Sequence, residues 1–414
     1  MSSETIFLYN AIAYTITLFF LYYKYKLSLG LILWGAYTIS AWSTWLFVQQ
    51  PMYWESMHYS KHTIFPCIYL FVSILLSIFP LCKISRLPNV EFNNISALKK
   101  ILIACIVIQT IFIIVDIPSV IRVLTTQSDL GSLREEAYAR DGDKGLSFIT
   151  QNALLNKFYL FYSGIRPLVS GLSVFLYFLC KKERKTVKVF LATTFIENLW
   201  HITILVGRGE MVITSCIYGC TLFLLRDYLS KKVKKILMVY ITPIIFLGAS
   251  AFWAITISRF GDYASFYMYK YMGESMNNFC GILYPGIQGH TDGQAYFSYV
   301  YRYLFGEVSW VDTESRYLLI EKITKIPAFI FYTYIGGLII EFGKIIPVFI
   351  IIAFNRMVNK IVLKKKIGLG IVIIYIALIY CFTYGIFTFP AQNFVGMGIL
   401  FFISLFCYLF RTTR

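Results

Sequence analysis

The sequence predicts an all-α polytopic membrane protein, and three observations lead to this prediction. Hydrophobic residues make up 58% of the 414 positions, whereas charged residues make up only 14%. The apolar residues fall in runs of roughly 20, the length that a helix needs to cross a hydrocarbon core about 30 Å thick. The connections between these runs alternate between strongly basic and mixed in charge, as positively charged cytosolic loops require.

Each apolar run predicts one transmembrane helix, and together they form a single integral membrane domain over residues 1–414. No basic region precedes the first run and no small-residue cleavage site follows it, so we expect a retained helix rather than a signal peptide. Residues 188–226 allow two interpretations, either two spans or one helix with a broken partner. The eleven runs are 6–23, 30–48, 64–81, 99–115, 158–180, 188–206, 211–226, 236–257, 328–354, 367–388 and 393–410.

The basic residues set the orientation of the chain. They concentrate in alternate connections such as KKERKTVK at 181–188 and NRMVNKIVLKKK at 355–366. Because cytosolic loops retain Lys and Arg, we expect these connections and the C-terminus in the cytoplasm, and the N-terminus in the periplasm of a bacterial inner membrane. The net charge of +17 then reflects topology. Nucleic-acid binding is not expected, because no basic, aromatic-interleaved soluble surface is present.

Cysteines and acidic clusters predict neither a disulfide framework nor a metal site. Eight of the nine cysteines lie in or beside apolar runs, and only Cys280 lies well inside an external connection. Acidic residues do cluster at Glu135–Glu136 and in the D-G-D motif at 141–143, but in a charged loop a solvated turn is the better interpretation. The sequence therefore predicts no metal and no cofactor.

Two external connections, 116–157 and 258–327, are long enough to indicate periplasmic loops with a function. The second combines aromatic, polar and charged side chains, and residues 316–326 are spaced like a helix lying in the interface. Sugars stack on aromatic rings and their hydroxyl groups hydrogen-bond to arginine, so Tyr263, Tyr299 and Arg316 are candidate substrate contacts. The alternative is an aromatic belt at the membrane surface.

Several arginines lie on the external side or just inside it, where a charge is costly unless it is paired or functional. The guanidinium group suits phosphate oxygens, so these arginines are candidates for binding a diphosphate. Gly207 and Gly209 allow a tight turn around one of them, and Glu210 then opens the next helix. A surface turn with an internal Arg–Glu pair is the alternative. The candidate arginines are Arg166, Arg208, Arg259 and Arg302.

The layout of spans and loops, the Gly-Arg-Gly turn at 207–209 and the Arg-Phe-Gly at 259–261 resemble the Wzy-type O-antigen polymerases. This resemblance implies a GT-C-like helical fold with two large periplasmic loops. It also implies a glycosyltransferase that moves a growing glycan from undecaprenyl diphosphate onto a new lipid-linked repeat unit at the periplasmic face. The implied partners are this lipid-linked oligosaccharide and the lipid bilayer, and a chain-length regulator is a further candidate.

Such a transfer needs a general base for the acceptor hydroxyl. The candidates are His290 in the GHTDG motif, the adjacent Asp292, and Glu210. Imidazole exchanges protons near neutral pH, and the flanking glycines Gly289 and Gly293 favour an accessible segment. His201 lies within an apolar run, where a packed or hydrogen-bonded role is the better interpretation.

Three other functions remain open. An O-antigen ligase uses the same donor but transfers the glycan to lipid A core. A lipid-linked oligosaccharide flippase is a transporter, and it fits less well because no internal repeat is present. A scaffold or channel is disfavoured because the polar residues gather on one face, with Glu197 and Glu341 as exceptions. These two could relay protons, although Lys344 is close enough in sequence to pair with Glu341.

Overall fold

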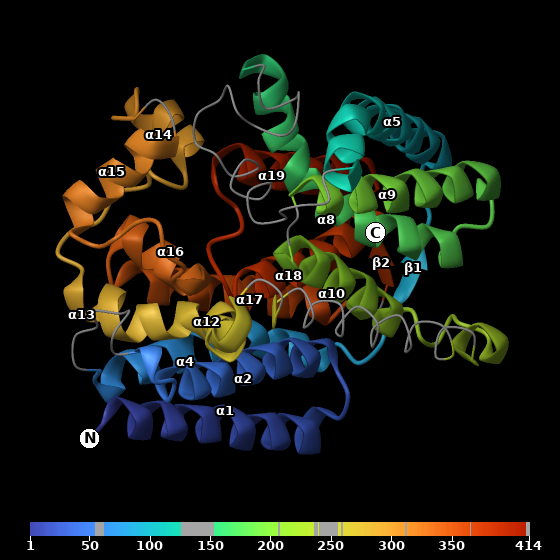
Figure 1. Ribbon diagram of the computed structural model, residues 1–414. Coiled ribbons are helices and arrows are strands. Elements are labelled where there is room, and N and C mark those ends of the chain that lie inside the picture. The colour runs from blue at the N-terminus through green and yellow to red at the C-terminus, as the bar shows by residue number, and fades with distance from the viewer. Residues whose placement is uncertain are drawn as a thin grey trace. The chain divides into compact units, whose positions relative to one another are not determined.

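A computed structural model describes residues 1–53, 62–125, 153–205, 208–235, 239, 256–257, 260–310, 313–364 and 366–410 (Figure 1). Within these ranges the regular structure is helical except for two three-residue strands. The elements are α1 Ser3–Tyr25, α2 Leu29–Val48, α4 Ile64–Ile78, η1 Phe79–Lys83, β1 Asn89–Glu91, α5 Ile95–Thr125, α8 Ala153–Leu179, α9 Arg184–Leu205, α10 Arg208–Leu224, η2 Gly261–Tyr263, α12 Ala264–Asn278, the π-helix η3 Phe279–Leu283, α13 Tyr284–Gly286, α14 Ser298–Phe305, α15 Thr313–Thr324, α16 Thr333–Phe342, α17 Ile346–Val362, β2 Lys366–Gly368, α18 Leu369–Tyr384 and α19 Asn393–Leu409.

Five stretches of the described chain are long and apolar enough to cross a membrane. They are α1, α2, α4 together with η1, α5 and α8. Shorter apolar helices include α10, α16, α18 and α19. The prediction of an all-α chain with helices suited to a membrane is therefore confirmed.

Two predicted runs differ from the observed helices. The run 99–115 belongs to a longer helix, α5, which continues past Pro118 into the segment predicted as a loop. The run 328–354 is divided between α16 and α17, because Gly343 adopts a φ of 71° and ends α16, while Pro347 lies in the first turn of α17. A glycine in this left-handed conformation ends a helix at little steric cost.

The remaining segments refine the sequence-based predictions. Within residues 188–226 the described chain forms two helices, α9 and α10, neither of which is among the five stretches long and apolar enough to cross a membrane. The predicted loop 258–327 contains α12, α14 and α15, and α15 covers most of the helix expected at 316–326. Most of the run 236–257 and residues 126–152 of the first long loop lie outside the described residues.

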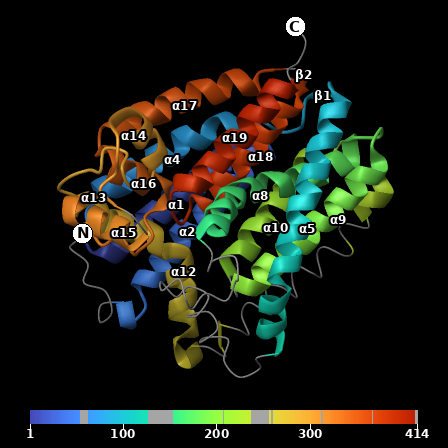
Figure 2. The ribbon, with the colours of Figure 1, turned by 90° about the horizontal axis from the view of Figure 1, so that it is seen from above.

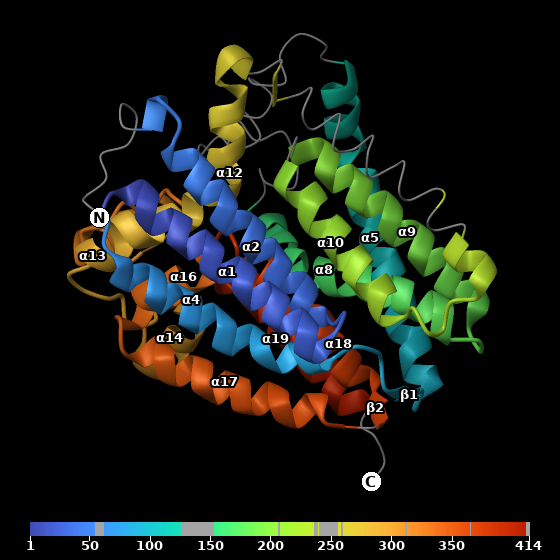
Figure 3. The ribbon, with the colours of Figure 1, turned by 90° about the horizontal axis from the view of Figure 1, so that it is seen from below.

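The chain divides into two compact units. Unit 1 comprises Met1–Ser85, Pro243–Lys364 and Cys381–Asn393. In unit 1, α1, α2 and α4 lie side by side (Figure 3), and α12 packs closely on α2. Ser40 Oγ donates to the carbonyl of Met272 at 2.7 Å and Thr44 Oγ1 to that of Gly273 at 3.0 Å, so small polar side chains join these two helices.

Unit 2 comprises Arg86–Thr242, Lys365–Tyr380 and Phe394–Arg414. Helix α9 packs on both α5 and α8, and α10 packs on α8 (Figure 2). The strands β1 and β2 form a short parallel pair, with Val90 opposite Ile367. An ion pair between Lys366 and Glu91 at 3.4 Å adds to this pairing.

Candidate functional site

In unit 1, residues 290–296 (hereafter the 290–296 segment) are held against the end of α16 by the buried side chain of Glu341. Thr291 Oγ1 donates to Glu341 Oε2 at 2.6 Å, and the backbone N–H of Tyr296 donates to Oε1. The backbone N–H groups of Gly293 and Ala295 also bond to this carboxylate. A buried carboxylate requires such donors, so Glu341 anchors the whole segment.

The expected pairing of Glu341 with Lys344 is wrong. Helix α16 ends at Phe342, so the two side chains do not share a helix face, and Glu341 turns instead toward the 290–296 segment. Lys344 places its Nζ 4.8 Å from the centre of the Tyr284 ring, in a cation–π contact.

His290 and Asp292 form a side-chain pair at the start of the anchored segment. His290 Nδ1 lies 2.8 Å from Asp292 Oδ1, and the side chains are 45% and 66% exposed. Asp292 holds a φ of 53° and Gly293 a φ of 90°, and the Asp292 N–H donates to the backbone carbonyl of Glu341 at 2.9 Å. When Nδ1–H donates to the carboxylate, Nε2 is the proton acceptor of the ring.

The glycine that ends α16 also leaves room for this histidine. A Cβ added at Gly343 would lie 3.2 Å from His290 Cδ2, which is tighter than an ordinary contact. The left-handed backbone and the proximity of the imidazole therefore both favour glycine at this position.

A buried arginine lies among aromatic rings in the same unit. Arg316 of α15 is 7% exposed, and its guanidinium carbon lies 4.9, 5.8 and 6.0 Å from the ring centres of Tyr317, Tyr296 and Trp310. Its Nη1 donates to Gln392 Oε1 at 3.4 Å, while its buried Nε has no hydrogen-bond partner among the described residues. We call Arg316 and these three rings the arginine–aromatic cluster.

Trp310 connects the arginine–aromatic cluster to the 290–296 segment. Its indole Nε1 donates to the carbonyl of Gln294 at 2.7 Å, and Tyr296 belongs to both groups. The exposed Arg302 also lies over the Trp310 ring, at 5.9 Å. Burial raises the pKa of the Tyr296 hydroxyl, and the positive charge of Arg316 opposes this rise.

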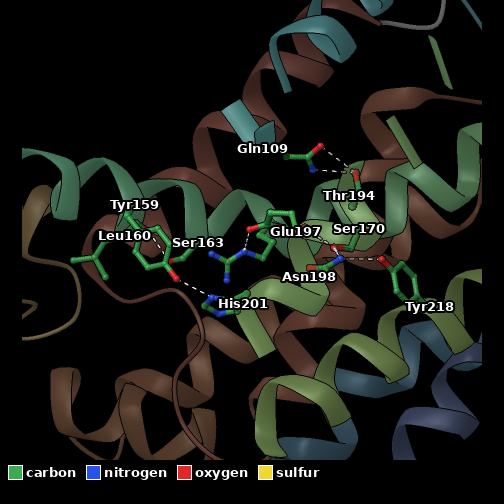
Figure 4. A network of polar contacts seen from close by, with 11 residues as sticks. Gln109, Tyr159, Leu160, Ser163, Ser170, Thr194, Glu197, Asn198, His201 and Tyr218 are labelled. Carbon is green, nitrogen blue, oxygen red and sulfur yellow. Dashed lines mark hydrogen bonds and ion pairs between the residues drawn. The ribbon is translucent and has the colours of Figure 1, made fainter. Parts of the chain in front are cut away.

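Unit 2 contains a separate network of polar side chains inside its helices (Figure 4). Arg166 Nε of α8 donates to Glu197 Oε1 of α9 at 2.8 Å, and these side chains are only 7% and 5% exposed. The hydroxyl of Tyr159 lies 2.7 Å from His201 Nδ1, and Asn198 donates to both Ser170 and Tyr218 at 2.8 Å (Figure 4). The hydrogen-bonded role expected for His201 is therefore confirmed.

Two further carboxylates among the described side chains lie near the Arg166–Glu197 pair. Asp116 and Glu210 both lie close enough to Glu197 to interact with it electrostatically, and Glu210 also interacts with Arg166. Glu210 lies in the first turn of α10, as expected. Arg166 Nη2 and Glu197 Oε2 are buried and have no hydrogen-bond partner among the described residues. Buried ionisable groups of this kind are usually functional in membrane proteins.

The structure thus places the predicted site residues in two groups. His290, Asp292, Arg302 and Arg316 belong to unit 1, where Trp310 and the 290–296 segment connect them. Arg166 and Glu210 belong to the unit 2 network. Tyr263 is exposed beside α12, and Tyr299 lies half-buried in α14. Arg259 and the side chain of Arg208 lie outside the described residues.

The anchoring role of Glu341 and the linking role of Trp310 were not predicted from the sequence. A carboxylate inside an apolar run indicated that Glu341 has a partner, but sequence proximity pointed to Lys344 and not to the 290–296 segment. Within the described ranges, no group of three or more His, Cys, Asp or Glu side chains could hold a metal ion. Comparisons with protein-family models, curated proteins and solved structures find no match to this chain.

Proposed function

We propose that the protein is a glycosyltransferase that polymerises lipid-linked repeat units at the periplasmic face of the bacterial inner membrane. The donor is a glycan on undecaprenyl diphosphate, and the acceptor is a hydroxyl group of a new lipid-linked repeat unit. The observation that carries this proposal is the His290–Asp292 pair, which lies on an anchored segment joined to an arginine–aromatic cluster.

In this proposal His290 is the general base. Asp292 accepts the Nδ1–H bond and so orients the ring and favours the tautomer with a free Nε2 lone pair. Nε2 takes the proton of the acceptor hydroxyl while its oxygen attacks the anomeric carbon of the donor. The bond from that carbon to the diphosphate oxygen breaks, and undecaprenyl diphosphate leaves with the electron pair. Asp292 is therefore a positioning residue rather than the base.

The departing diphosphate needs fixed positive charge. Within the described ranges, Arg302 and Arg316 form no ion pair, whereas Arg166 is paired with Glu197. Arg302 and Arg316 therefore replace Arg166 as the better candidates for a diphosphate contact. The half-buried ring of Trp310 offers a flat face of the kind on which sugars stack, and its N–H is already bonded to Gln294.

One observation favours a second candidate, a transporter of lipid-linked oligosaccharides. The unit 2 network buries Arg166, Glu197 and Asp116 within apolar helices, and Glu210 lies half-buried beside them. Ionisable groups in such positions mark substrate or proton pathways in many transporters. This alternative predicts movement of the lipid-linked glycan without formation of a new glycosidic bond.

The test uses the full-length protein in detergent, together with undecaprenyl-diphosphate-linked glycans extracted from the cells that produce the protein. We expect a ladder of products that differ by one repeat unit. His290→Ala should lower the rate by about 10²- to 10⁴-fold, the usual contribution of a general base, and Asp292→Asn by less. Glu314→Ala, which removes an exposed carboxylate from α15, is the matched control and should keep wild-type activity.

The other outcomes distinguish the alternatives. A ladder that is equally strong in His290→Ala contradicts the assignment of the base. Transfer that occurs only after addition of lipid A core indicates a ligase. Absence of transfer with every acceptor, together with movement of the lipid-linked glycan across liposomes, rejects the enzyme and supports the transporter.

A further inference from the structure

An apolar groove opens on unit 1 between α1 and α2, with a volume of about 270 Å³. Leu18, Phe19 and Tyr22 of α1 form one wall, and Leu31 and Gly35 of α2 form much of the other, with Leu27 at the turn end. Phe19, Tyr22 and Leu27 are exposed, so the groove is accessible from the surface of the described chain.

Gly35 keeps this groove open. A Cβ at Gly35 would meet no atom within 4 Å, so the protein itself does not require a glycine there. Gly30 in the same helix is different, because a Cβ there would press on the backbone of Cys82. Glycine lowers the stability of a helix interior relative to alanine. The absent side chain at Gly35 therefore leaves space for something outside the chain.

Contacts at both ends of the groove fix the position of α2. Trp34 Nε1 donates to the carbonyl of Tyr14 at 3.0 Å, and the two rings stack at 4.8 Å. At the other end, the N–H of Leu29 donates to the carbonyl of Ile84 at 2.8 Å. Because Trp34 joins α2 to α1 and Leu29 joins α2 to the residue that follows η1, the groove is a feature of the folded unit.

The length of the groove and the lysines at its end indicate its occupant. From Leu18 to Lys26 the helix rises by about 12 Å, close to half of a hydrocarbon core about 30 Å thick. The exposed Lys26 ends α1 directly beside Leu27, and the exposed Lys24 precedes it. The basic connection that contains them is expected on the cytosolic side, where the leaflet is rich in anionic lipids.

We propose that this groove binds one acyl chain of an anionic phospholipid of the cytosolic leaflet, with the lipid phosphate beside Lys26. Lipid tails gain little by moving from the bilayer to an apolar groove, so selectivity comes from close packing and from the headgroup charge. The site lies at the opposite membrane face from the proposed glycan transfer. It depends on membrane insertion but not on the proposed enzymatic activity.

Native mass spectrometry of the full-length protein tests this proposal. The protein is released from detergent after incubation with equal amounts of dioleoylphosphatidylglycerol and dioleoylphosphatidylcholine. We expect wild type to retain the anionic lipid about fivefold more than the zwitterionic one, and Lys26→Gln to remove most of that preference. Gly35→Phe fills the groove and should abolish retention, with the smaller Gly35→Leu as a second variant if Gly35→Phe does not fold.

The matched control is Gly219→Phe in α10, another helix-interior glycine whose added Cβ would meet no atom within 4 Å. This variant should retain the lipid as wild type does. The proposal is overturned if both Gly35 variants bind as much lipid as Gly219→Phe, because the groove is then not the binding site. Equal retention of the two lipids by wild type overturns the anionic headgroup.

Discussion

Removal of the Glu341 carboxylate should release the 290–296 segment from α16. In the folded protein this carboxylate accepts hydrogen bonds from the Thr291 hydroxyl and from the backbone N–H groups of Gly293, Ala295 and Tyr296. Glu341→Ala removes all four acceptor contacts. Glu341→Gln keeps the shape and one oxygen but loses the charge, so it should have a smaller effect.

The size of the effect follows from the number and kind of these bonds. Hydrogen bonds to a charged group contribute about 1.5–3 kcal/mol each, so four of them contribute roughly 6 kcal/mol or more. Water can replace part of this in the variant, because the adjacent His290 and Asp292 are 45% and 66% exposed. We therefore expect Glu341→Ala to lower the free energy of local opening by about 3 kcal/mol, and Glu341→Gln by about 1 kcal/mol.

Hydrogen–deuterium exchange measures this local opening directly. A loss of about 3 kcal/mol corresponds to roughly 100-fold faster exchange of the amides of Gly293, Ala295 and Tyr296. Peptides from α9 and α10, which belong to unit 2, should exchange as in wild type. Glu314→Ala serves as the control, since it removes an exposed carboxylate outside the segment.

Exchange across the 290–296 segment decides whether Glu341 is its anchor. If Glu341→Ala leaves exchange across the 290–296 segment within threefold of wild type, Glu341 does not anchor it. If Glu341→Gln opens the segment as fully as Glu341→Ala, one amide oxygen does not suffice and the anchor requires the intact carboxylate.

Three further predictions concern other parts of the chain. Arg166→Met or Glu197→Leu alone should destabilise unit 2 by about 3–5 kcal/mol, because each removes the hydrogen-bonded partner of a buried charge, whereas the double variant should lose less than the sum of the two. Melting in detergent compares the three variants, and additive losses would contradict the pairing. Burial lowers the pKa of His62 from 6.5 to about 4, so the folded protein favours the neutral imidazole. The free energy of unfolding should therefore be highest above pH 6.5 and should fall by about 3 kcal/mol as the pH drops from 6.5 toward 4. Melting temperatures at pH 7.5, 5.5 and 4.5 test this, and His62→Phe should show a weaker pH dependence than wild type. Gly343→Ala should lower transferase activity more than Gly219→Ala, because its Cβ would press on His290 and its backbone has a φ of 71°, which alanine rarely adopts. Equal activities of the two variants would show that Gly343 does not support the position of His290.

The pattern of apolar runs sufficed to predict a helical membrane protein and the approximate positions of its long apolar helices. The length of an apolar run is set by the thickness of the hydrocarbon that it must cross, so the runs 6–23, 30–48 and 393–410 correspond closely to α1, α2 and α19. Local composition also indicated the placement of Glu210 in the first turn of α10.

Partnerships between distant residues were decided only by the tertiary structure. A carboxylate in an apolar run must find a donor, but Glu197 and Arg166 are 31 positions apart, and Glu341 reaches back 50 positions to Thr291. Composition likewise does not distinguish Arg316, buried among aromatic rings, from the exposed Arg302. Burial and pairing depend on which helices pack together, because the energetic cost of a charge is set by its surroundings and not by its position in the chain.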